Sequence, residues 1–224
     1  MMMRIEVLSE DRSGGAMIEK IIPKMLSFDT RQIDFAVRPH RGLGEWPDNN
    51  TSHPKKNATG LLELLPAKLR AYDKVYASTR TLVIVIMDTD KNDPDEIRSR
   101  IKDMCRKNGP NLKTVIGLCT EETEAWLMGD VDAIKQAYPD ADMQVMDEYV
   151  QDSICGTWEV LCRVLLKEKA GRAIRIGYPA IGQLKSEWSG RISKYMDPAK
   201  NKSPSYNRFK KDFEKAVNFI MEQR

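Results

Sequence analysis

The stretch LVIVIMDTDKND, at residues 82–93, joins an aliphatic run to two aspartates that are spaced one residue apart. Five consecutive aliphatic residues, Leu82 to Ile86, are typical of a strand that is buried on both faces of a parallel sheet. An ionised carboxylate does not enter such surroundings without a partner. We therefore expect Asp88 and Asp90 just past the end of a central strand, where they either face solvent or meet a cation.

Strand and helix patterns alternate on both sides of this stretch. Three further strands are predicted, at residues 3–9, 33–38 and 113–119. Helices are predicted at residues 16–28, 58–78, 93–107, 156–170 and 204–223, with another that begins at residue 122. A long loop rich in Gly, Pro and Asn is expected over residues 39–56. Strands that alternate with helices predict an α/β fold with a mostly parallel central sheet and helices on both faces.

Length and composition agree with one α/β unit that carries a helical appendage. The chain has 224 residues, of which 41% are hydrophobic and 31% charged. We predict an α/β core over residues 1–152 and a helical C-terminal extension over residues 153–224 that packs on this core. No window approaches the roughly 18 apolar residues of a membrane span, and the first residues lack the apolar core of a signal peptide. A cytoplasmic protein without a membrane partner is expected.

The cysteines and histidines give no sign of a zinc site. The four cysteines lie at positions 105, 119, 155 and 162 and form no CxxC pair. Reduced thiols are the expected state in a cytosolic protein. His40 and His53 are isolated within the polar loop, with no partner at ligand spacing, and are predicted to be surface residues.

The net charge of +3 hides an uneven distribution. Residues 87–152 hold 16 acidic and 8 basic side chains, whereas residues 163–215 hold 14 basic and 5 acidic ones. An acidic segment followed by a basic one suits a protein that holds a cation beside a polyanion. Two solvated helix faces would produce the same counts, so charge alone leaves both interpretations open.

Acidic residues follow three of the predicted strands. They are Glu10 and Asp11, then Asp88 and Asp90, then Glu121, Glu122 and Glu124. Working residues of parallel sheets gather at the carboxyl ends of strands, and converging carboxylates repel one another by several kcal/mol unless a cation neutralises them. Hard oxygen ligands favour Mg²⁺ or Mn²⁺ over zinc. In an extended chain the side chains of Asp88 and Asp90 face the same side, so both are expected to reach the metal.

These motifs, taken in order, resemble the Toprim domain of topoisomerases, primases and the nucleases of the overcoming-lysogenization-defect family. The shared features are a glutamate after the first strand, an apolar strand that ends in DxD, and a further acidic residue downstream. CTEETEAWLMGD (residues 119–130) and NKSPSYNRF (residues 201–209) also resemble two segments, E-A-W-L-x-x-D and SPS-aromatic, of small bacterial Toprim-like proteins of unassigned function. The resemblance covers most of the chain. Many Toprim domains have glycine where this chain has Asp11.

The resemblance implies a Toprim-like, Rossmann-like fold and a divalent-metal-dependent nuclease or related phosphodiester hydrolase. The implied catalytic residues are Glu10, Asp88 and Asp90, and the implied ligands of Mg²⁺ or Mn²⁺ are these three and Glu124. Lys200, Lys202 and Ser205 are implied contacts for phosphate or nucleic acid. The implied partner is nucleic acid, DNA ahead of RNA, with a partner ATPase or a homodimer as further candidates. A role in bacterial defence follows only by analogy with related nucleases.

Other interpretations stay open. A non-catalytic Toprim-like module that binds metal or nucleic acid beside a partner would need nearly the same acids. VIVIMDTD also resembles the opening of a haloacid-dehalogenase-type phosphatase, in which the first aspartate is the nucleophile. That family expects Gly-Thr soon after the second aspartate, where this chain has Lys91 and Asn92. Lys200, Lys202 and Ser205 would equally form a solvated loop and a helix N-cap.

Overall fold

Four parallel strands form the centre of the molecule. The computed structural model describes residues 2–26, 33–49, 53–76 and 79–222. The strands are β1 (Met3–Ser9), β2 (Ile33–Pro39), β3 (Thr81–Asp88) and β4 (Lys113–Cys119). Their order in the sheet is β2-β1-β3-β4, and every neighbouring pair is parallel. The predicted α/β class with a parallel sheet is confirmed, and the arrangement is Rossmann-like.

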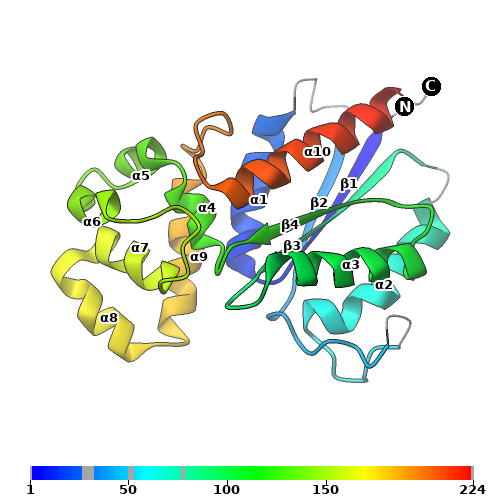
Figure 1. The fold of residues 1–224 in the computed structure, drawn as a ribbon, viewed down its shortest axis with the longest axis horizontal. Coiled ribbons are helices and arrows are strands. Elements are labelled where there is room, and N and C mark those ends of the chain that lie inside the picture. Colours follow the sequence, from blue (N-terminus) through cyan, green and yellow to red (C-terminus); the bar gives the residue numbers. More distant parts are fainter. Residues whose placement is uncertain (1, 27–32, 50–52, 77–78, 223–224) are drawn as a thin grey trace.

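Helices cover both faces of this sheet (Figure 1). Two pack on one face, α1 (Arg12–Met25) and α10 (Pro204–Glu222), and two on the other, α2 (Leu61–Tyr76) and α3 (Pro94–Asn108). The side chains of β3 alternate between the two layers. Leu82, Ile84 and Ile86 belong to the core under α1 and α10, whereas Val83, Val85 and Met87 belong to the core under α2 and α3. This double burial is the reason that β3 is an uninterrupted aliphatic run.

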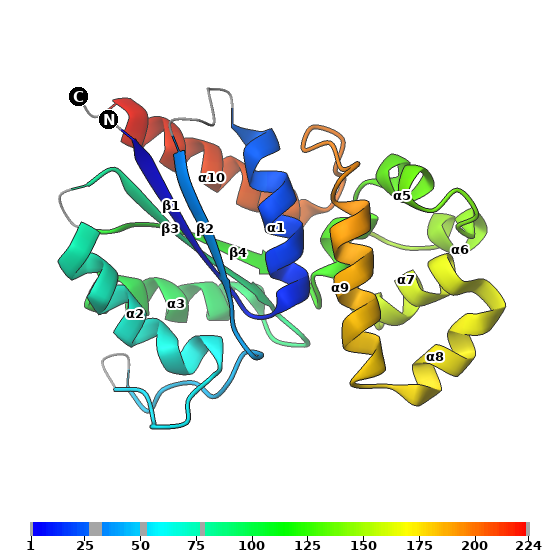
Figure 2. The same cartoon turned by 180° about the vertical axis from the view of Figure 1, so that it is seen from behind.

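A group of shorter helices lies beyond the carboxyl ends of the strands. It contains α4 (Glu124–Met128), α5 (Val131–Ala137), α6 (Met143–Asp147), α7 (Thr157–Leu166), α8 (Ala170–Ile176) and α9 (Ala180–Ile192), with a 3₁₀ turn at Lys167–Lys169. Figure 2 shows α9 alongside α1. The Ser189 hydroxyl donates to the carbonyl of Ser13 at 2.5 Å, and the Lys24 ammonium donates to the carbonyl of Met196 at 2.8 Å. These contacts hold α9 and the segment that follows it against α1.

Helix α10 returns from this group to the sheet and completes the core. Trp126 of α4 stacks on Phe209 of α10 with ring centroids 5.1 Å apart, and it meets Tyr206 edge-on at 5.4 Å. The predicted C-terminal helix is therefore present and packs on the α/β core. The predicted boundary after residue 152 lies between α6 and α7.

Some predicted helix limits differ from the structure. The ends predicted at residues 28, 78 and 223 lie outside the described residues. The helix predicted over 156–170 stops at Leu166, because the next residue, Lys167, has a φ of +52° that no α-helix accommodates. Helices α5, α6, α8 and α9 were not predicted. No helix among the described residues combines the length and apolar character that a membrane crossing requires.

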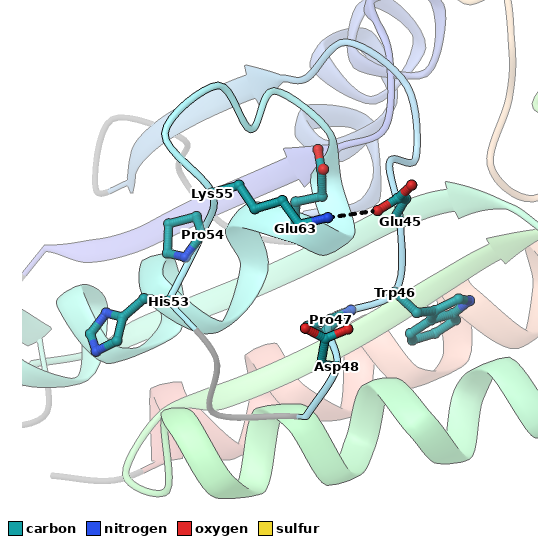
Figure 3. Close-up of a pocket in the computed structure, with 8 residues that line it drawn as sticks. All are labelled: Glu45, Trp46, Pro47, Asp48, His53, Pro54, Lys55 and Glu63. Atoms are coloured by element: carbon teal, nitrogen blue, oxygen red, sulfur yellow. Dashed lines mark hydrogen bonds and ion pairs between the residues drawn. The ribbon is translucent and has the colours of Figure 1, made fainter.

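The loop after β2 holds both histidines in different surroundings. His53 is exposed, as predicted. The prediction that His40 is a surface residue is wrong, since it is 8% exposed and its Nδ1 lies 2.8 Å from the carbonyl oxygen of Ser9. Hydrogen bonding between the ends of β2 and β1 carries His40 inward. A cavity of about 70 Å³ lies in this loop. Figure 3 shows its lining residues, with the ion pair of Glu45 and Lys55 among them.

Candidate functional site

Two of the predicted site residues meet at the ends of neighbouring strands. Glu10 directly follows β1, and Asp88 is the last residue of β3. The backbone N–H of Glu10 donates to the carbonyl of Ile86 at 3.0 Å, which extends the pairing of the two strands. The backbone N–H of Asp88 then donates to Oε2 of Glu10 at 3.1 Å. The parallel sheet therefore brings the two acidic residues together, as the sequence predicts.

Glu124 joins them from the start of α4. Its side chain is completely buried, and neither carboxylate oxygen has a hydrogen-bond partner among the described residues. The hydroxyl of the preceding residue, Thr123, donates to Oδ1 of Asp88 at 2.8 Å. The charges of Glu10 and Glu124 both act on Asp88. We call Glu10, Asp88 and Glu124 the acidic cluster.

Lys185 of α9 supplies a cation to this cluster. Its Nζ lies 3.2 Å from Oε2 of Glu124 and 3.5 Å from Oε1 of Glu122, and its side chain is 7% exposed. Burial lowers the pKa of Lys185, but attraction to the carboxylates of Glu124, Glu122 and Asp88 outweighs burial and leaves this pKa above its ordinary value. Lys185 is therefore a charged ammonium at neutral pH.

Sequence reasoning missed Lys185, although α9 carries a signal for it. Lys185 follows Ile181 by four residues and precedes Trp188 by three, so the three share one face of the helix. Ile181 and Trp188 are buried, and Lys185 is buried between them at 5% exposure. A lysine on the apolar face of a helix indicates a buried carboxylate partner.

Burial shifts the acids of this region toward their neutral forms. Burial, with repulsion from Asp11 and Asp90, raises the pKa of Glu10 to about 7. Burial, followed by repulsion from Glu10 and Glu124, holds the pKa of Asp88 well above its usual range. Burial also raises the pKa of Glu124, despite the attraction of Lys185. One ammonium therefore does not compensate the negative charge that these carboxylates would carry when ionised.

Glu6 shows the contrast with a fully paired buried acid. It lies in β1 and is completely buried. Its carboxylate accepts from Nε of Arg38 at 2.7 Å and from Nε of Arg4 at 2.8 Å. Burial raises the pKa of Glu6, but these two guanidinium groups outweigh it and leave the pKa below its ordinary value. Glu6 is a structural residue held by two guanidinium groups, whereas Glu124 has a single ion pair, with Lys185, and no hydrogen bond among the described residues.

Asp90 does not follow the predicted geometry. The chain leaves the extended conformation after Asp88, and Asp90 has a φ of +48° and is exposed. The backbone N–H groups of Thr89 and Asp90 donate to the carbonyls of Cys119 at 3.0 Å and Glu121 at 2.9 Å. These bonds turn the chain, so the expectation that an extended DxD points both carboxylates to one side is wrong. The charge of Asp90 still contributes to the raised pKa of Glu10. Asp90 therefore lies at the solvent-exposed rim of the acidic cluster.

Two acids beside β4 fix the start of α7. The Glu121 carboxylate accepts from the backbone N–H groups of Cys155, Gly156 and Thr157, at 3.1, 2.9 and 2.9 Å, and from the Thr157 hydroxyl. The Glu122 carboxylate accepts from the backbone N–H of Trp158 at 2.9 Å. These are the free N–H groups of a helix N-terminus. Glu121 thus has a structural role, and burial raises the pKa of Glu122 to about 7.

Asp11, which directly follows Glu10, makes local contacts at the start of α1. Its Oδ1 accepts from the backbone N–H of Gly14 at 2.8 Å, and its Oδ2 accepts from the Ser13 hydroxyl at 2.6 Å. Asp11 is therefore the N-cap of α1. The cap begins α1 immediately after Glu10.

The residues predicted to bind phosphate make other contacts. The Lys200 ammonium pairs with the exposed carboxylate of Asp132 at 3.3 Å, and the backbone N–H of Lys202 donates to the carbonyl of Gly129 at 2.8 Å. The Ser205 hydroxyl accepts from Nε1 of Trp126 at 2.8 Å. Among the described hydrogen bonds and ion pairs, none joins Lys200, Lys202 or Ser205 to the acidic cluster.

The SPS segment caps α10. The hydroxyl of Ser203 accepts from the backbone N–H of Tyr206 at 3.1 Å, and Pro204 takes the first helical position. The carboxylate of Asp152 accepts from the Ser203 hydroxyl at 2.7 Å and from the backbone N–H of Ser205 at 2.6 Å. The cap and the ring contacts of Trp126 with α10 join the EAWL and SPSY segments into one structural unit.

The donor set of the acidic cluster fits a hard divalent cation in chemistry. Glu10, Asp88 and Glu124 offer carboxylate oxygens only, and those of Glu124 are buried without hydrogen bonds. Across the residues that the structure describes, no three His, Cys, Asp or Glu side chains are arranged to hold a metal ion. Binding of Mg²⁺ or Mn²⁺ would therefore require these carboxylates to move toward one another, with Lys185 at their side.

A cavity of about 290 Å³ lies between the loop after β3 and the start of α7, and it is lined by neighbours of the acidic cluster and not by its three members. Its lining residues include Asp90, Lys91, Glu122, Trp158 and Glu159. A ligand that enters this cavity approaches Glu122, the second ion-pair partner of Lys185.

No protein-family model, curated protein or solved structure gives a significant match to this chain.

Proposed function

We propose that this protein is a divalent-metal-dependent phosphodiester hydrolase that acts on nucleic acid, DNA ahead of RNA. The observation that carries the proposal is the contact of Glu10 with Asp88 at the carboxyl ends of β1 and β3, beside the completely buried Glu124 of α4, with the pKa of all three carboxyl groups raised. Acidic residues with strongly raised pKa values at the carboxyl ends of strands are more typical of functional sites than of residues with a purely structural role. The resemblance to Toprim domains supports the same chemistry.

Each residue of the cluster has a role in this proposal. Glu10, Asp88 and Glu124 would hold Mg²⁺ or Mn²⁺, which when bound supplies charge neutralisation and activation of water. Glu10 would either complete the ligand set of the metal or, if it stays outside that set, accept a proton from the attacking water. The Lys185 ammonium would stabilise the negative charge of a phosphate beside Glu124. Asp90, at the rim, would orient the ligand in the adjoining cavity.

A non-catalytic module is the second candidate, and one observation favours it. Lys185 already pairs with Glu122 and Glu124 at 3.5 and 3.2 Å, so the cluster has a resident cation of its own. In this case the protein would bind nucleic acid or metal without cleaving it, and would act beside an ATPase or a second copy of the chain.

The experiment that separates the two candidates is a cleavage assay on plasmid DNA, single-stranded DNA and structured RNA with Mg²⁺, Mn²⁺ or EDTA. Hydrolysis predicts metal-dependent cleavage that disappears in Asp88→Ala. Asp95→Ala is the matched control, because Asp95 lies beyond the same strand but is 78% exposed and pairs with Arg208 at 3.0 Å. Cleavage that survives Asp88→Ala or EDTA would contradict the hydrolase. Binding of nucleic acid without cleavage under any condition would favour the module.

A further inference from the structure

Strand β4 forms one edge of the sheet, and a groove runs along it between α3 and α10. Figure 1 shows α10 and α3 on either side of β4. Two ion pairs bridge these helices, Arg208 with Asp95 at 3.0 Å and Arg98 with Asp212 at 3.9 Å. The groove has a volume of about 440 Å³, and we call it the β4-edge groove. This volume is within the range of about 300–1,000 Å³ typical of small-ligand sites.

The lining of the β4-edge groove is strongly basic. Arg98 and Lys102 come from α3, Lys113 from β4 and Lys215 from α10, and the acidic side chain among the lining residues is Asp212. Four positive charges against one negative charge in a confined space attract an anion.

Arg98 gives the groove a buried donor without an acceptor. This residue is 6% exposed, and its Nη1 donates to the carbonyl of Ile116 at 3.0 Å. Its Nε has no hydrogen-bond partner among the described residues. The carboxylate of Asp212 lies 3.9 Å from Nη1, beyond hydrogen-bonding distance. A buried guanidinium N–H that lacks an acceptor is costly, and a ligand oxygen would relieve that cost.

The groove also has an apolar part. Val115 and Ala216 line it, together with Phe219, whose side chain is 48% exposed. The ammonium of Lys113 lies 4.2 Å from the centre of the Phe219 ring. A ligand with both an anionic group and a ring would find partners for both.

We propose that the β4-edge groove binds a small organic phosphate, with its phosphate oxygens on Arg98, Lys102 and Lys215 and its apolar portion against Phe219. The unpartnered donor is almost fully buried, so the ligand has to enter the groove, which favours a small molecule over the backbone of a nucleic acid duplex. The groove follows β4 from Lys113 to Ile116, so even its near end lies three residues, about 10 Å, before Cys119, and none of its lining residues belongs to the acidic cluster. The proposal is therefore independent of the proposed hydrolase activity.

The test is a calorimetric titration of the full chain with AMP, inorganic phosphate and pyrophosphate, and with adenosine as the ligand that lacks the anion. AMP is expected to bind, adenosine is not, and Lys215→Glu is expected to weaken AMP binding at least about ten-fold. Lys211→Glu is the matched control, an exposed lysine of α10 outside the groove, and it is expected to change the affinity less than about two-fold. Arg98→Met tests the buried donor, with its fold checked by circular dichroism.

Three results would overturn the proposal. The first is that none of the three phosphates binds at millimolar concentration. The second is equal weakening by Lys215→Glu and Lys211→Glu, which would indicate diffuse charge attraction. The third is displacement of AMP by a DNA duplex but not by excess pyrophosphate, which would assign the groove to a nucleic acid backbone.

Discussion

Replacement of Lys185 by methionine tests the electrostatics of the acidic cluster most directly. Methionine keeps most of the length of the lysine side chain, so the main change is loss of the ammonium. Glu124 and Glu122 then lose the cation that lies 3.2 and 3.5 Å from their oxygens. Because the side chain of Glu124 is completely buried, water does not replace the lost partner.

The expected loss of stability follows from these distances. At an effective dielectric constant near 20, two unit charges at 3.2 Å attract by roughly 5 kcal/mol. Removal of the lysine also removes the cost of burying its charge, which returns part of this energy. We therefore expect the free energy of unfolding of Lys185→Met to fall by about 3–5 kcal/mol at neutral pH.

Urea denaturation of the wild type and the variant measures this difference. Lys200→Met is the control, because Lys200 also pairs with a carboxylate, Asp132, at 3.3 Å, but both side chains are about 60% exposed. Exposed pairs contribute little, so the control is expected to lose less than about 1 kcal/mol. Equal losses in the two variants would refute the argument, since burial would then make no difference to the pair.

The pH dependence of the variant gives a second check. The pKa of Glu122 is about 7 in the folded protein, above its value in the unfolded chain. The folded state therefore loses stability as the pH rises from the unfolded pKa to the folded pKa. Loss of Lys185 raises the pKa of this group and of Glu124 further. The difference in the free energy of unfolding between the wild type and Lys185→Met is therefore expected to become smaller as the pH is lowered from about 8 to about 5. A difference that stays constant or grows as the pH is lowered would contradict the conclusion that Lys185 stabilises the ionised forms of Glu122 and Glu124.

Three further changes test other parts of the structure. Glu121→Ala removes the acceptor for the N-terminus of α7 and is expected to cost at least about 2 kcal/mol in urea denaturation, whereas a neutral result would deny its capping role. Gly117→Ala would place a Cβ against Ile86 and 3.0 Å from the rings of Phe209 and Trp126, with an expected loss of about 1–3 kcal/mol by the same measurement. Mg²⁺ is expected to raise the thermal unfolding midpoint of the wild type but not of an Asp88→Ala variant, and an equal shift in both would exclude the cluster as the metal site.

Most of the fold was predictable because buried hydrophobic residues recur along the chain with the period of the helix or strand that contains them. The uninterrupted aliphatic run of β3 is needed where both faces of a strand are covered, and it marked the centre of the sheet correctly. The meeting of Glu10 and Asp88 was predictable for a related reason, since parallel strands end at a common edge.

Other parts were not predictable because they depend on contacts between distant segments. Asp90 leaves the extended conformation because its N–H finds the carbonyl of Glu121. Glu121 has a structural role only because α7, whose Thr157 lies 36 residues further along the chain, places its N-terminus there. Lys200 forms an exposed ion pair with Asp132, and the Ser205 hydroxyl accepts a hydrogen bond from Trp126. The spacing of residue types along the chain does not reveal such contacts.

The α/β class and the presence of acids at the ends of strands can be inferred without a structure, because both follow from local hydrophobic periodicity and chain order. The packing of distant segments determines which acid caps a helix, which is exposed and which is paired. Lys185 is the clearest case, since it reaches Glu122 from 63 residues along the chain. The packing of α9 on α1 puts it there, and the energy of a buried charge depends on where its partner lies in space.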